Sequence, residues 1–266
     1  MFVTQRTPEW HKQRRGKLTA SVAGAAIGVC SYQTPLQCME QVVGDKPFNG
    51  NIFTEWGTKN EPNASVEYSI MSGNSVQPAD FCVHPVLNWL GGSPDVFVDS
   101  EGLVEFKCPW KRKKKPLPDD LCDIPLQYFV QCQVLMEVTN KNWCDLFFWT
   151  PEEHRVWRFT RSRDMFENLL PSFTNYYALM ARLHSSESKA WRSLVKADIS
   201  NQFNQPMAEY VRGRMMESNV ELPFSKASDI KCNEALKLQS LTPVRGSPLV
   251  HSSTPYSCPS SIQATA

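Results

Sequence analysis

The chain lacks the segments that direct a protein into or across a membrane. It has no apolar run near the roughly 20 residues that a membrane-spanning helix requires, and no amino-terminal signal peptide is evident. No internal repeat is visible either. These absences predict an intracellular protein, cytoplasmic or nuclear, that is not secreted and has no membrane partner.

Closely spaced cysteines are also missing, although cysteine itself is not rare. The nine cysteines are an odd number, are widely scattered and include no Cys-x-x-Cys pair. We therefore expect reduced thiols and no iron–sulfur cluster, and we expect Cys108 and Cys132 to lie in the core. The cysteines are Cys30, Cys38, Cys82, Cys108, Cys122, Cys132, Cys144, Cys232 and Cys258.

A large excess of one charge is absent as well. The net charge is +1, which argues against a protein that coats nucleic acid but leaves room for a local positive groove. With 266 residues, 41% of them hydrophobic, the chain can bury one sizeable core. One domain with extensions is therefore favoured over two full domains.

Two carboxylates and a lysine stand close together in the middle of the chain. Residues 96–98 and 103–108 have strand composition, and the turn chemistry of residues 99–102 predicts a hairpin in which Gly102 is available for a positive φ. That hairpin places Asp95 roughly opposite Glu105. The two-residue period of a strand puts Glu105 and Lys107 on the same face.

Carboxylates held together without a cation repel one another, and oxygen ligands of this kind suit Mg²⁺. A bound ion can activate water and stabilise charge during phosphodiester hydrolysis, with Lys107 placed to hold the water or offset negative charge. The pattern therefore suggests a metal-dependent nuclease site. An exposed hairpin with an ordinary charge pair is the alternative.

A second candidate site lies near the amino terminus. Thr7 and Pro8 predict the start of a short helix that ends at Gly16, and Thr19 can cap a second helix over residues 20–27. Ser21 then lies at a helix amino terminus, with Arg14 nearby as a donor, which suits a phosphate. The alternative is ordinary capping beside a solvated arginine.

A helix is also predicted over residues 55–68, with Glu61, Ala64 and Tyr68 on one stripe. An inward glutamate is unfavourable unless it is paired or metal-bound, so Glu61 could complete the cluster. Glu67 lies off the stripe, so we expect it to be solvated. Pro62 fits this helix best if Glu61 belongs to its first turn.

Residues 125–138 predict a mostly apolar helix on which Gln131 is the unusual polar residue. A partly buried glutamine can orient a water or a phosphate oxygen, although a satisfied structural amide is equally consistent with the sequence.

In their order and spacing these segments resemble the phage lambda exonuclease and YqaJ family of viral recombination nucleases, within the PD-(D/E)xK fold. The resemblance covers roughly residues 5–183. It rests on a Trp-x-x-x-Arg-x-Gly-x-x-Thr-Ala-Ser block, a Trp-Gly-x-x-x-Glu-x-x-Ala helix, Ser-Pro-Asp, Glu-x-Lys-Cys-Pro and a Tyr-x-x-Gln-x-Gln helix. The matching positions are Arg14, Ser21, Glu61, Asp95, Glu105, Lys107, Tyr128, Gln131 and Gln133.

The resemblance implies an α/β fold with a central mixed sheet flanked by helices, and 5′ to 3′ digestion of linear double-stranded DNA. It implies Mg²⁺ or Mn²⁺, two ions, held by Glu61, Asp95, Glu105 and the backbone carbonyl of Phe106. It further implies catalytic roles for Lys107 and Gln131, an annealing protein as a possible partner, and a trimer as a possible homo-oligomer.

The sequence departs from the family pattern in two places. Val96 replaces the glycine that commonly follows Ser-Pro-Asp. A basic run that includes Lys111, Arg112 and Lys113 and extends to Lys115 follows the active-site strand. This run could contact DNA phosphates, direct nuclear import, or form a solvated loop.

The remaining elements are expected to complete one nuclease domain over residues 1–184. A hairpin is predicted over residues 140–162, and a helix over residues 164–184 that Pro171 kinks or interrupts. Residues 185–225 predict a helical extension, and residues 226–266 a disordered tail.

Three functions remain open from the sequence. The favoured one is a metal-dependent exonuclease in recombination or viral DNA processing. An endonuclease of the same fold and a non-catalytic DNA-binding module are the alternatives, the latter disfavoured because a bare acidic cluster repels phosphate.

Overall fold

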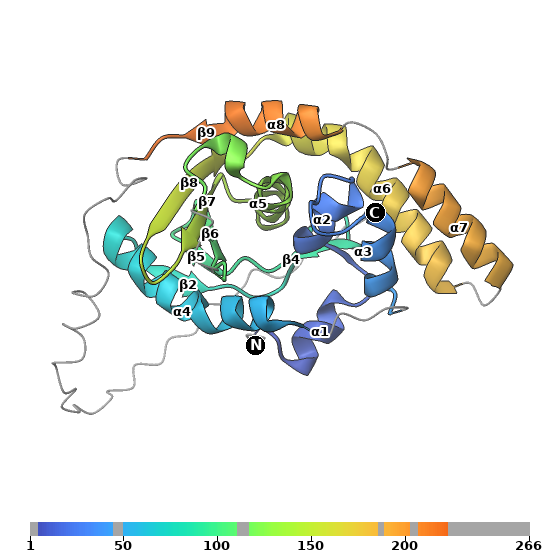
Figure 1. Ribbon diagram of the computed structural model, residues 1–266, viewed down its shortest axis with the longest axis horizontal. Helices are drawn as coiled ribbons and strands as arrows, with labels where there is room; N and C mark the ends of the chain where they lie inside the picture. Colours follow the sequence, from blue (N-terminus) through green and yellow to red (C-terminus); the bar gives the residue numbers. More distant parts are fainter. Residues whose placement is uncertain (1–4, 45–49, 111–116, 186–188, 203–206, 223–266) are drawn as a thin grey trace, which may run out of the picture. The chain divides into compact units, whose positions relative to one another are not determined.

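The computed structural model describes residues 5–44, 50–110, 117–185, 189–202 and 207–222 (Figure 1). The helices are α1 Pro8–Arg14, α2 Ala20–Ala26, α3 Pro35–Val42, α4 Ile52–Ser72, α5 Leu126–Thr139, α6 Arg163–Ser185, α7 Lys189–Gln202 and α8 Met207–Ser218, with a 3-10 turn at Leu121–Asp123. The strands are β1 Leu18–Thr19, β2 Val76–Pro78, β3 Cys82–Val83, β4 Leu90–Gly92, β5 Val96–Val98, β6 Gly102–Lys107, β7 Trp143–Trp149, β8 His154–Thr160 and β9 Asn219–Val220.

The strands form a mixed sheet, as expected for this fold class. Its order is β2-β5-β6-β7-β8-β9, and β6 and β7 run parallel while the other neighbouring pairs are antiparallel. A smaller sheet has the order β1-β4-β3. The predicted α/β architecture with a central mixed sheet is confirmed.

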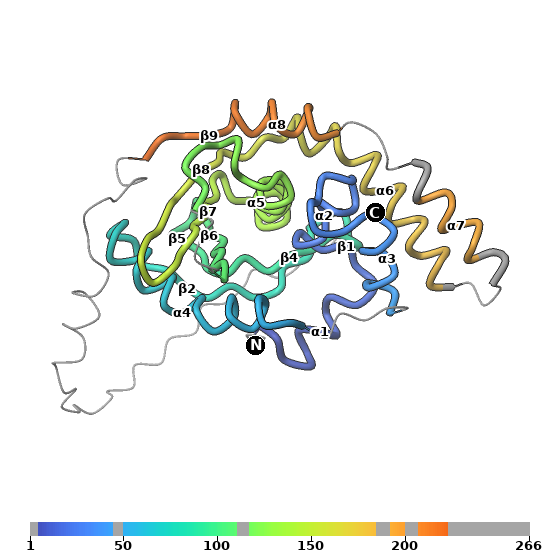
Figure 2. The backbone as a smooth tube through the Cα atoms, viewed as in Figure 1, coloured from blue at the N-terminus to red at the C-terminus, as the bar shows by residue number. Residues whose placement is uncertain are grey.

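Helices cover both faces of the larger sheet. Helix α5 lies between the sheet and α2, and α4 packs on the opposite face (Figures 1 and 2). The alternation of β6 explains this arrangement, because Leu103 belongs to the core shared with α5, whereas Val104 and Phe106 belong to the core under α4. Glu105 and Lys107 therefore point to the α5 side, as their two-residue spacing predicts.

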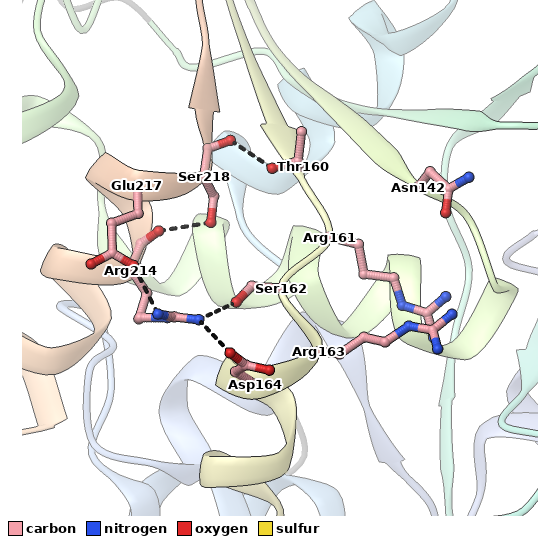
Figure 3. A pocket seen from close by; sticks show the side chains of 9 residues that line it. All are labelled: Asn142, Thr160, Arg161, Ser162, Arg163, Asp164, Arg214, Glu217 and Ser218. Atoms are coloured by element: carbon pink, nitrogen blue, oxygen red, sulfur yellow. Dashed lines mark hydrogen bonds and ion pairs between the residues drawn. The ribbon is translucent and has the colours of Figure 1, made fainter.

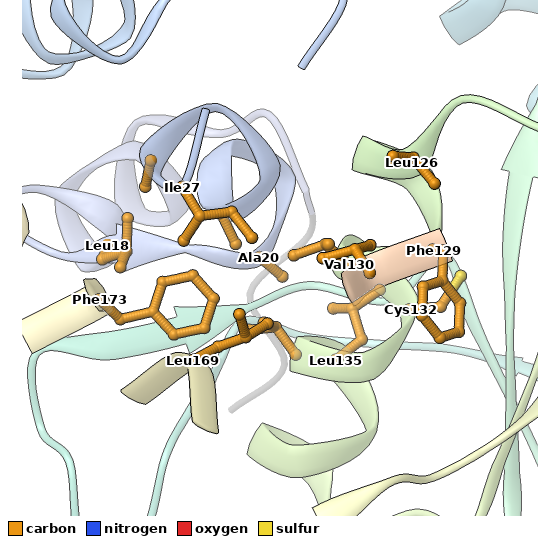
Figure 4. Close-up of a cluster of buried hydrophobic side chains, with 14 of the residues drawn as sticks. Leu18, Ala20, Ile27, Leu126, Phe129, Val130, Cys132, Leu135, Leu169 and Phe173 are labelled. Carbon is orange, nitrogen blue, oxygen red and sulfur yellow. The ribbon is translucent and has the colours of Figure 1, made fainter. Parts of the chain in front are cut away.

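The larger core joins α2, α5 and α6 (Figure 4). Ile27 at the C-cap of α2, Phe129 from α5 and Phe173 from α6 are among its buried side chains. Gly24 permits the close approach of α2 and α5, since a Cβ at this position would lie 2.6 Å from the Cα of Gln127. Cys132 is buried in this core, and Cys108 in the core under α4, as predicted.

The predicted hairpin of β5 and β6 forms, with a different residue in the turn. Val96 pairs with Val104 and Val98 with Gly102. The positive φ occurs at Asp99 (48°), whose side chain accepts from Glu101 N, and not at Gly102. Gly102 instead accommodates an aromatic ring, because a Cβ there would lie 2.1 Å from Trp143.

Helix α4 begins earlier than the sequence suggests. Asn51 and Thr54 form a capping box at its start, so Glu61 and Pro62 lie inside the helix and not in its first turn. The capping box at Asn51 stabilises the start of the helix and outweighs the backbone hydrogen bond that Pro62 cannot donate.

Glu67 was expected to be solvated, and this expectation is wrong. Its carboxylate accepts from Trp149 Nε1 at 2.6 Å and lies 2.8 Å from His154 Nδ1. Glu67 therefore joins α4 to the sheet through a partly buried polar network with Trp149 and His154. The stripe of Ala64 and Tyr68 in the sequence gives no sign of this network.

The carboxy-terminal elements continue the same body of structure. The hairpin of β7 and β8 extends the sheet as predicted, and α6 runs through Pro171 without interruption. Val195 of α7 and Val211 and Met215 of α8 are buried in the core of α2 and α5, and β9 pairs with β8. The division into residues 1–184 and 185–225 stays a prediction, and the predicted tail, 226–266, lies outside the described residues.

Candidate active site

Glu105, Lys107 and Gln131 form a hydrogen-bonded group between β6 and α5. Glu105 Oε1 accepts from Lys107 Nζ at 2.7 Å and from Gln131 Nε2 at 2.6 Å. Lys107 Nζ also donates to Gln131 Oε1 at 3.2 Å. Gln131 thus holds both ends of the charge pair, so it is an orienting residue and not an isolated core amide.

Only one oxygen of Glu105 is satisfied in this arrangement. The residue is 4% exposed, and its Oε2 atom has no hydrogen-bond partner among the described residues. A buried carboxylate oxygen without a partner is unfavourable by roughly 1–3 kcal/mol, and more when it is charged. This oxygen is available to a cation.

Asp95 lies at the entry to β5, next to Glu105. Its Oδ2 accepts from Phe106 N at 2.7 Å, which fixes the carboxylate across the hairpin. Burial, and after it the charges of Glu105 and Glu61, raise the pKa of Asp95 well above its ordinary value. The structure thus brings Glu61 and Glu105 close enough to Asp95 for their charges to act on it, and the role of these three carboxylates as metal ligands stays a prediction.

Lys107 supplies positive charge inside this cluster. Burial is the largest single influence and would lower the pKa of Lys107, but the charges of Glu105, Tyr128 and Asp95 and the hydrogen bond to Glu105 together raise it by more, so the net shift is upward. The ammonium also lies 4.6 Å from the ring centre of Tyr128. Lys107 is therefore a fixed cation and not a base at neutral pH.

Glu61 reaches the cluster from α4, but a cation of the protein already binds it. Arg6 Nη2 donates to Glu61 Oε1 at 2.8 Å and to Oε2 at 2.7 Å. Burial raises the pKa of Glu61, with Arg6 opposing this shift and Glu105 adding to it. Nothing in the sequence pattern marks Arg6, which lies 55 residues from its partner.

Arg14 and Ser21 also come together, as predicted. Arg14 Nη2 donates to Ser21 Oγ at 3.1 Å and to Thr19 Oγ1 at 3.2 Å, and the guanidinium lies 4.2 Å from the Trp10 ring centre. Burial lowers the pKa of Arg14 to about 10, and the field of Glu105 partly opposes this. Thr19 makes no side-chain cap, so its hydroxyl serves Arg14 instead.

Two further contacts shape the rim of the site and were not found from the sequence. Trp10 Nε1 donates to Ser93 Oγ at 2.8 Å, joining α1 to the Ser-Pro-Asp segment. The Tyr32 hydroxyl lies 3.4 Å from that of Tyr128, and Tyr32 is 70% exposed. Gln133, by contrast, binds Thr160 O and Ser162 N and is structural.

A model of the YqaJ-like viral recombinase domain family matches residues 9–142, about half of the chain, and this span contains the cluster and Arg14. The chain belongs to this family. The chain is also 27% identical over 168 residues to uncharacterized protein R354 of Acanthamoeba polyphaga mimivirus. That match covers 58% of this chain and 30% of the relative, so the chain spans less than a third of that protein's length.

Solved structures share the fold of this YqaJ-like domain. The alkaline exonuclease LHK-Exo from Laribacter hongkongensis superposes with a TM-score of 0.54 at 24% identity, covering 73% of this chain and 98% of that one. LHK-Exo in complex with dAMP gives 0.50 at 23% identity, covering 79% and 99%. The likeness establishes a common fold.

The family resemblance implies a divalent metal ion at the carboxylates of the YqaJ-like domain. No three His, Cys, Asp or Glu side chains among the described residues are arranged around one point that could hold an ion. The chemistry still fits Mg²⁺ or Mn²⁺, because oxygen donors gather at Asp95 and Glu105 and the Glu105 Oε2 atom lacks a partner. Both oxygens of Glu61, the third carboxylate of the implied metal site, already accept hydrogen bonds from Arg6.

A pocket of about 440 Å³ lies elsewhere, at the end of the sheet where β7 begins (Figure 3). Two of its three arginines make structural contacts: Arg161 binds Glu137 and Asn140, and Arg214 binds Glu217 and Ser162. Because β6 and β7 are parallel and Lys107 pairs with Phe148, the cluster lies toward the other end of these strands. The pocket is therefore separate from the candidate site.

The basic run that contains Lys111, Arg112 and Lys113 lies outside the described residues. Among the described helices, none has the length and apolar content needed to cross a membrane.

Proposed function

We propose that the YqaJ-like domain is a metal-dependent deoxyribonuclease that hydrolyses linear double-stranded DNA, digesting each strand from its 5′ end. The observation that carries the proposal is the group formed by Asp95, Glu105, Lys107 and Gln131, in which a buried carboxylate oxygen is left without a partner. A pure binding module gains nothing from such a cluster, since it repels phosphate.

The residues of the chain divide the work of hydrolysis. Asp95 and Glu105, with Glu61 and the Phe106 carbonyl, would hold one or two Mg²⁺ or Mn²⁺ ions, which supply Lewis-acid stabilisation of the phosphate and an activated water. Lys107 is charged and fixed by Glu105 and Gln131, so it is suited to stabilising negative charge on the phosphate. Gln131 keeps the ammonium in place.

The pair of Arg14 and Ser21 favours recognition of a strand end. Both side chains already share a hydrogen bond, and a 5′-phosphate would accept from the same donors. The charge of Glu105 raises the pKa of Arg14 and so partly opposes the effect of burial, which supports a position of the proposed phosphate pocket near the carboxylates. This supports an exonuclease over an endonuclease.

The test compares end-labelled linear duplex with the matching covalently closed circle, in Mg²⁺ and in EDTA. We expect metal-dependent loss of the linear DNA alone, with release from 5′ ends. Cutting of the circle would replace the proposal with an endonuclease, and binding without cutting would replace it with a non-catalytic module.

A separate comparison tests the phosphate pocket. Arg14→Gln should slow digestion of 5′-phosphorylated ends by about tenfold or more and affect 5′-hydroxyl ends less, because a charge-assisted hydrogen bond is lost. Arg15→Gln, an exposed neighbour, is the control. Equal slowing on both kinds of end would remove Arg14 from end recognition.

We further propose, on the family resemblance, an intracellular role in recombination or viral DNA processing. A single-strand annealing protein and self-association into a trimer are the corresponding partner proposals. Sedimentation of the full chain with and without duplex DNA tests whether it forms a trimer.

A further inference from the structure

The amino-terminal arm, residues 5–10, places the guanidinium of Arg6 on Glu61, at the edge of the carboxylate cluster. A single nitrogen of Arg6, Nη2, donates to both oxygens of Glu61. The Arg6 side chain is 46% exposed and that of Glu61 is 25% exposed, so the pair lies at the edge of the cluster and is open to solvent on one side. Solvent can therefore reach and replace the guanidinium.

The arm is held in place by contacts on either side of Arg6. Gln5 Nε2 donates at 2.8 Å to the carbonyl oxygen of Pro94, the residue immediately before Asp95, and at 3.3 Å to that of Ala79. Trp10 Nε1 binds Ser93 Oγ. Arg6 itself has a φ of +68°, an unusual value for a residue with a side chain. The arm thus tracks the Ser-Pro-Asp segment and directs Arg6 at Glu61.

The ion pair has a consequence for the proposed metal site. Glu61, Asp95 and Glu105 lie near one another, and among the described residues Arg6 forms an ion pair with Glu61 and Lys107 forms one with Glu105. Lys107 is fixed on both sides by Glu105 and Gln131, whereas Arg6 binds Glu61 at the solvent edge. A divalent ion that binds a Glu61 oxygen shares this carboxylate with the guanidinium, and the positive charges of the two repel each other.

We infer that Arg6 is a positioning residue, which holds Glu61 at the cluster in the metal-free protein and gives it up when a divalent ion binds. The inference rests on the proposed metal dependence. The guanidinium and the ion compete for the same carboxylate, so each weakens the binding of the other.

The experiment measures equilibrium binding of Mn²⁺ to the full chain without DNA, by the electron paramagnetic resonance signal of the free ion at mildly alkaline pH. Arg6→Gln should tighten Mn²⁺ binding by about two- to fivefold, the change expected when a partly exposed ion pair stops competing. Arg15→Gln removes the same charge at the C-cap of α1, where no contact with Glu61 is made, and should change the affinity by much less.

Glu61→Gln provides the second half of a double-mutant cycle. It should weaken Mn²⁺ binding, and adding Arg6→Gln to it should have no further effect, because the competing carboxylate is gone. Thermal melting of each variant checks that the fold is retained. A purely structural role for Arg6 would lower the melting temperature without tightening metal binding.

The results separate this inference from the proposed function. Tighter binding in Arg6→Gln, abolished in the double variant, supports the inference even if the wild-type chain cuts no DNA. Unchanged or weaker binding, an effect that survives Glu61→Gln, or no Mn²⁺ binding by any variant would overturn it. If the chain shows any of these outcomes and still hydrolyses DNA, the proposed function holds and the inference about Arg6 fails.

Discussion

Asp95 and Glu105 are the two carboxylates on which the proposed metal site depends most. Asp95→Asn and Glu105→Gln keep the size of each side chain and remove its charge. We expect each to lower the rate of DNA hydrolysis by about a thousandfold or more, since electrostatic stabilisation of the reacting phosphate is lost. The measurement is single-turnover digestion of linear duplex in Mg²⁺.

Binding provides the control for these two variants. Because removing a negative charge reduces repulsion of phosphate, affinity for duplex DNA in EDTA should be equal or greater. Near-normal hydrolysis in either variant would show that the reacting phosphate lies elsewhere.

Lys107 is expected to act on the rate more than on affinity. Its ammonium is fixed by Glu105 and Gln131, so Lys107→Gln should lower the hydrolysis rate by about a hundredfold while changing the Kd for DNA by less than about fivefold. Rates and Kd values measured on the same duplex give the comparison. An equal loss in both quantities would reduce Lys107 to a phosphate-binding residue.

Among the elements, the contact between α2 and α5 has the least room. A Cβ at Gly24 would lie 2.6 Å from backbone and side-chain carbons of Gln127, so Gly24→Ala must push the helices apart. We expect a loss of about 1–3 kcal/mol in the free energy of unfolding, measured by urea denaturation.

Gly213 in α8 is the matched control, since nothing lies within 4 Å of a Cβ built there. Gly213→Ala should stabilise the protein by about 0.5–1 kcal/mol through helix propensity. A neutral Gly24→Ala would mean that α2 and α5 adjust to each other freely.

The elements that the sequence predicts well are those with strong local patterns. The alternation of residues 103–108 and the caps at Thr7 and Pro8 depend on neighbours in the chain, and β6 and α1 form as expected. Short edge strands such as β2 and β9 have too few residues for a detectable period. Their pairing with β5 and β8 is decided by tertiary contact.

The contacts of the candidate site divide in the same way, into those that a local pattern predicts and those that only tertiary structure creates. Spacing along one strand predicts that Glu105 and Lys107 share a face, and the structure confirms it. The pairs of Arg6 with Glu61 and of Glu67 with His154 join residues 55 and 87 positions apart. Neither pair has a periodic signal, so only the folded chain brings them together.

For the molecule as a whole, the carboxylate cluster should lower stability when no ion is bound. The pKa of Asp95 is raised in the folded protein, so the folded state binds this proton more tightly than the unfolded state does. Stability is therefore lost as pH rises from the ordinary value of 3.8 through the raised value. Asp95→Asn should raise the melting temperature of the metal-free protein at neutral pH and flatten its decline over that pH range.

Adding the ion should reverse the same penalty. A divalent ion at about 100 times its Kd stabilises the folded state by about 2.7 kcal/mol, so Mg²⁺ should raise the melting temperature of the wild-type chain by several degrees relative to EDTA. Asp95→Asn and Glu105→Gln should lose most of this increase. An equal rise in all three proteins would indicate that Mg²⁺ binds away from the cluster, because both variants remove ligands that the proposed site requires.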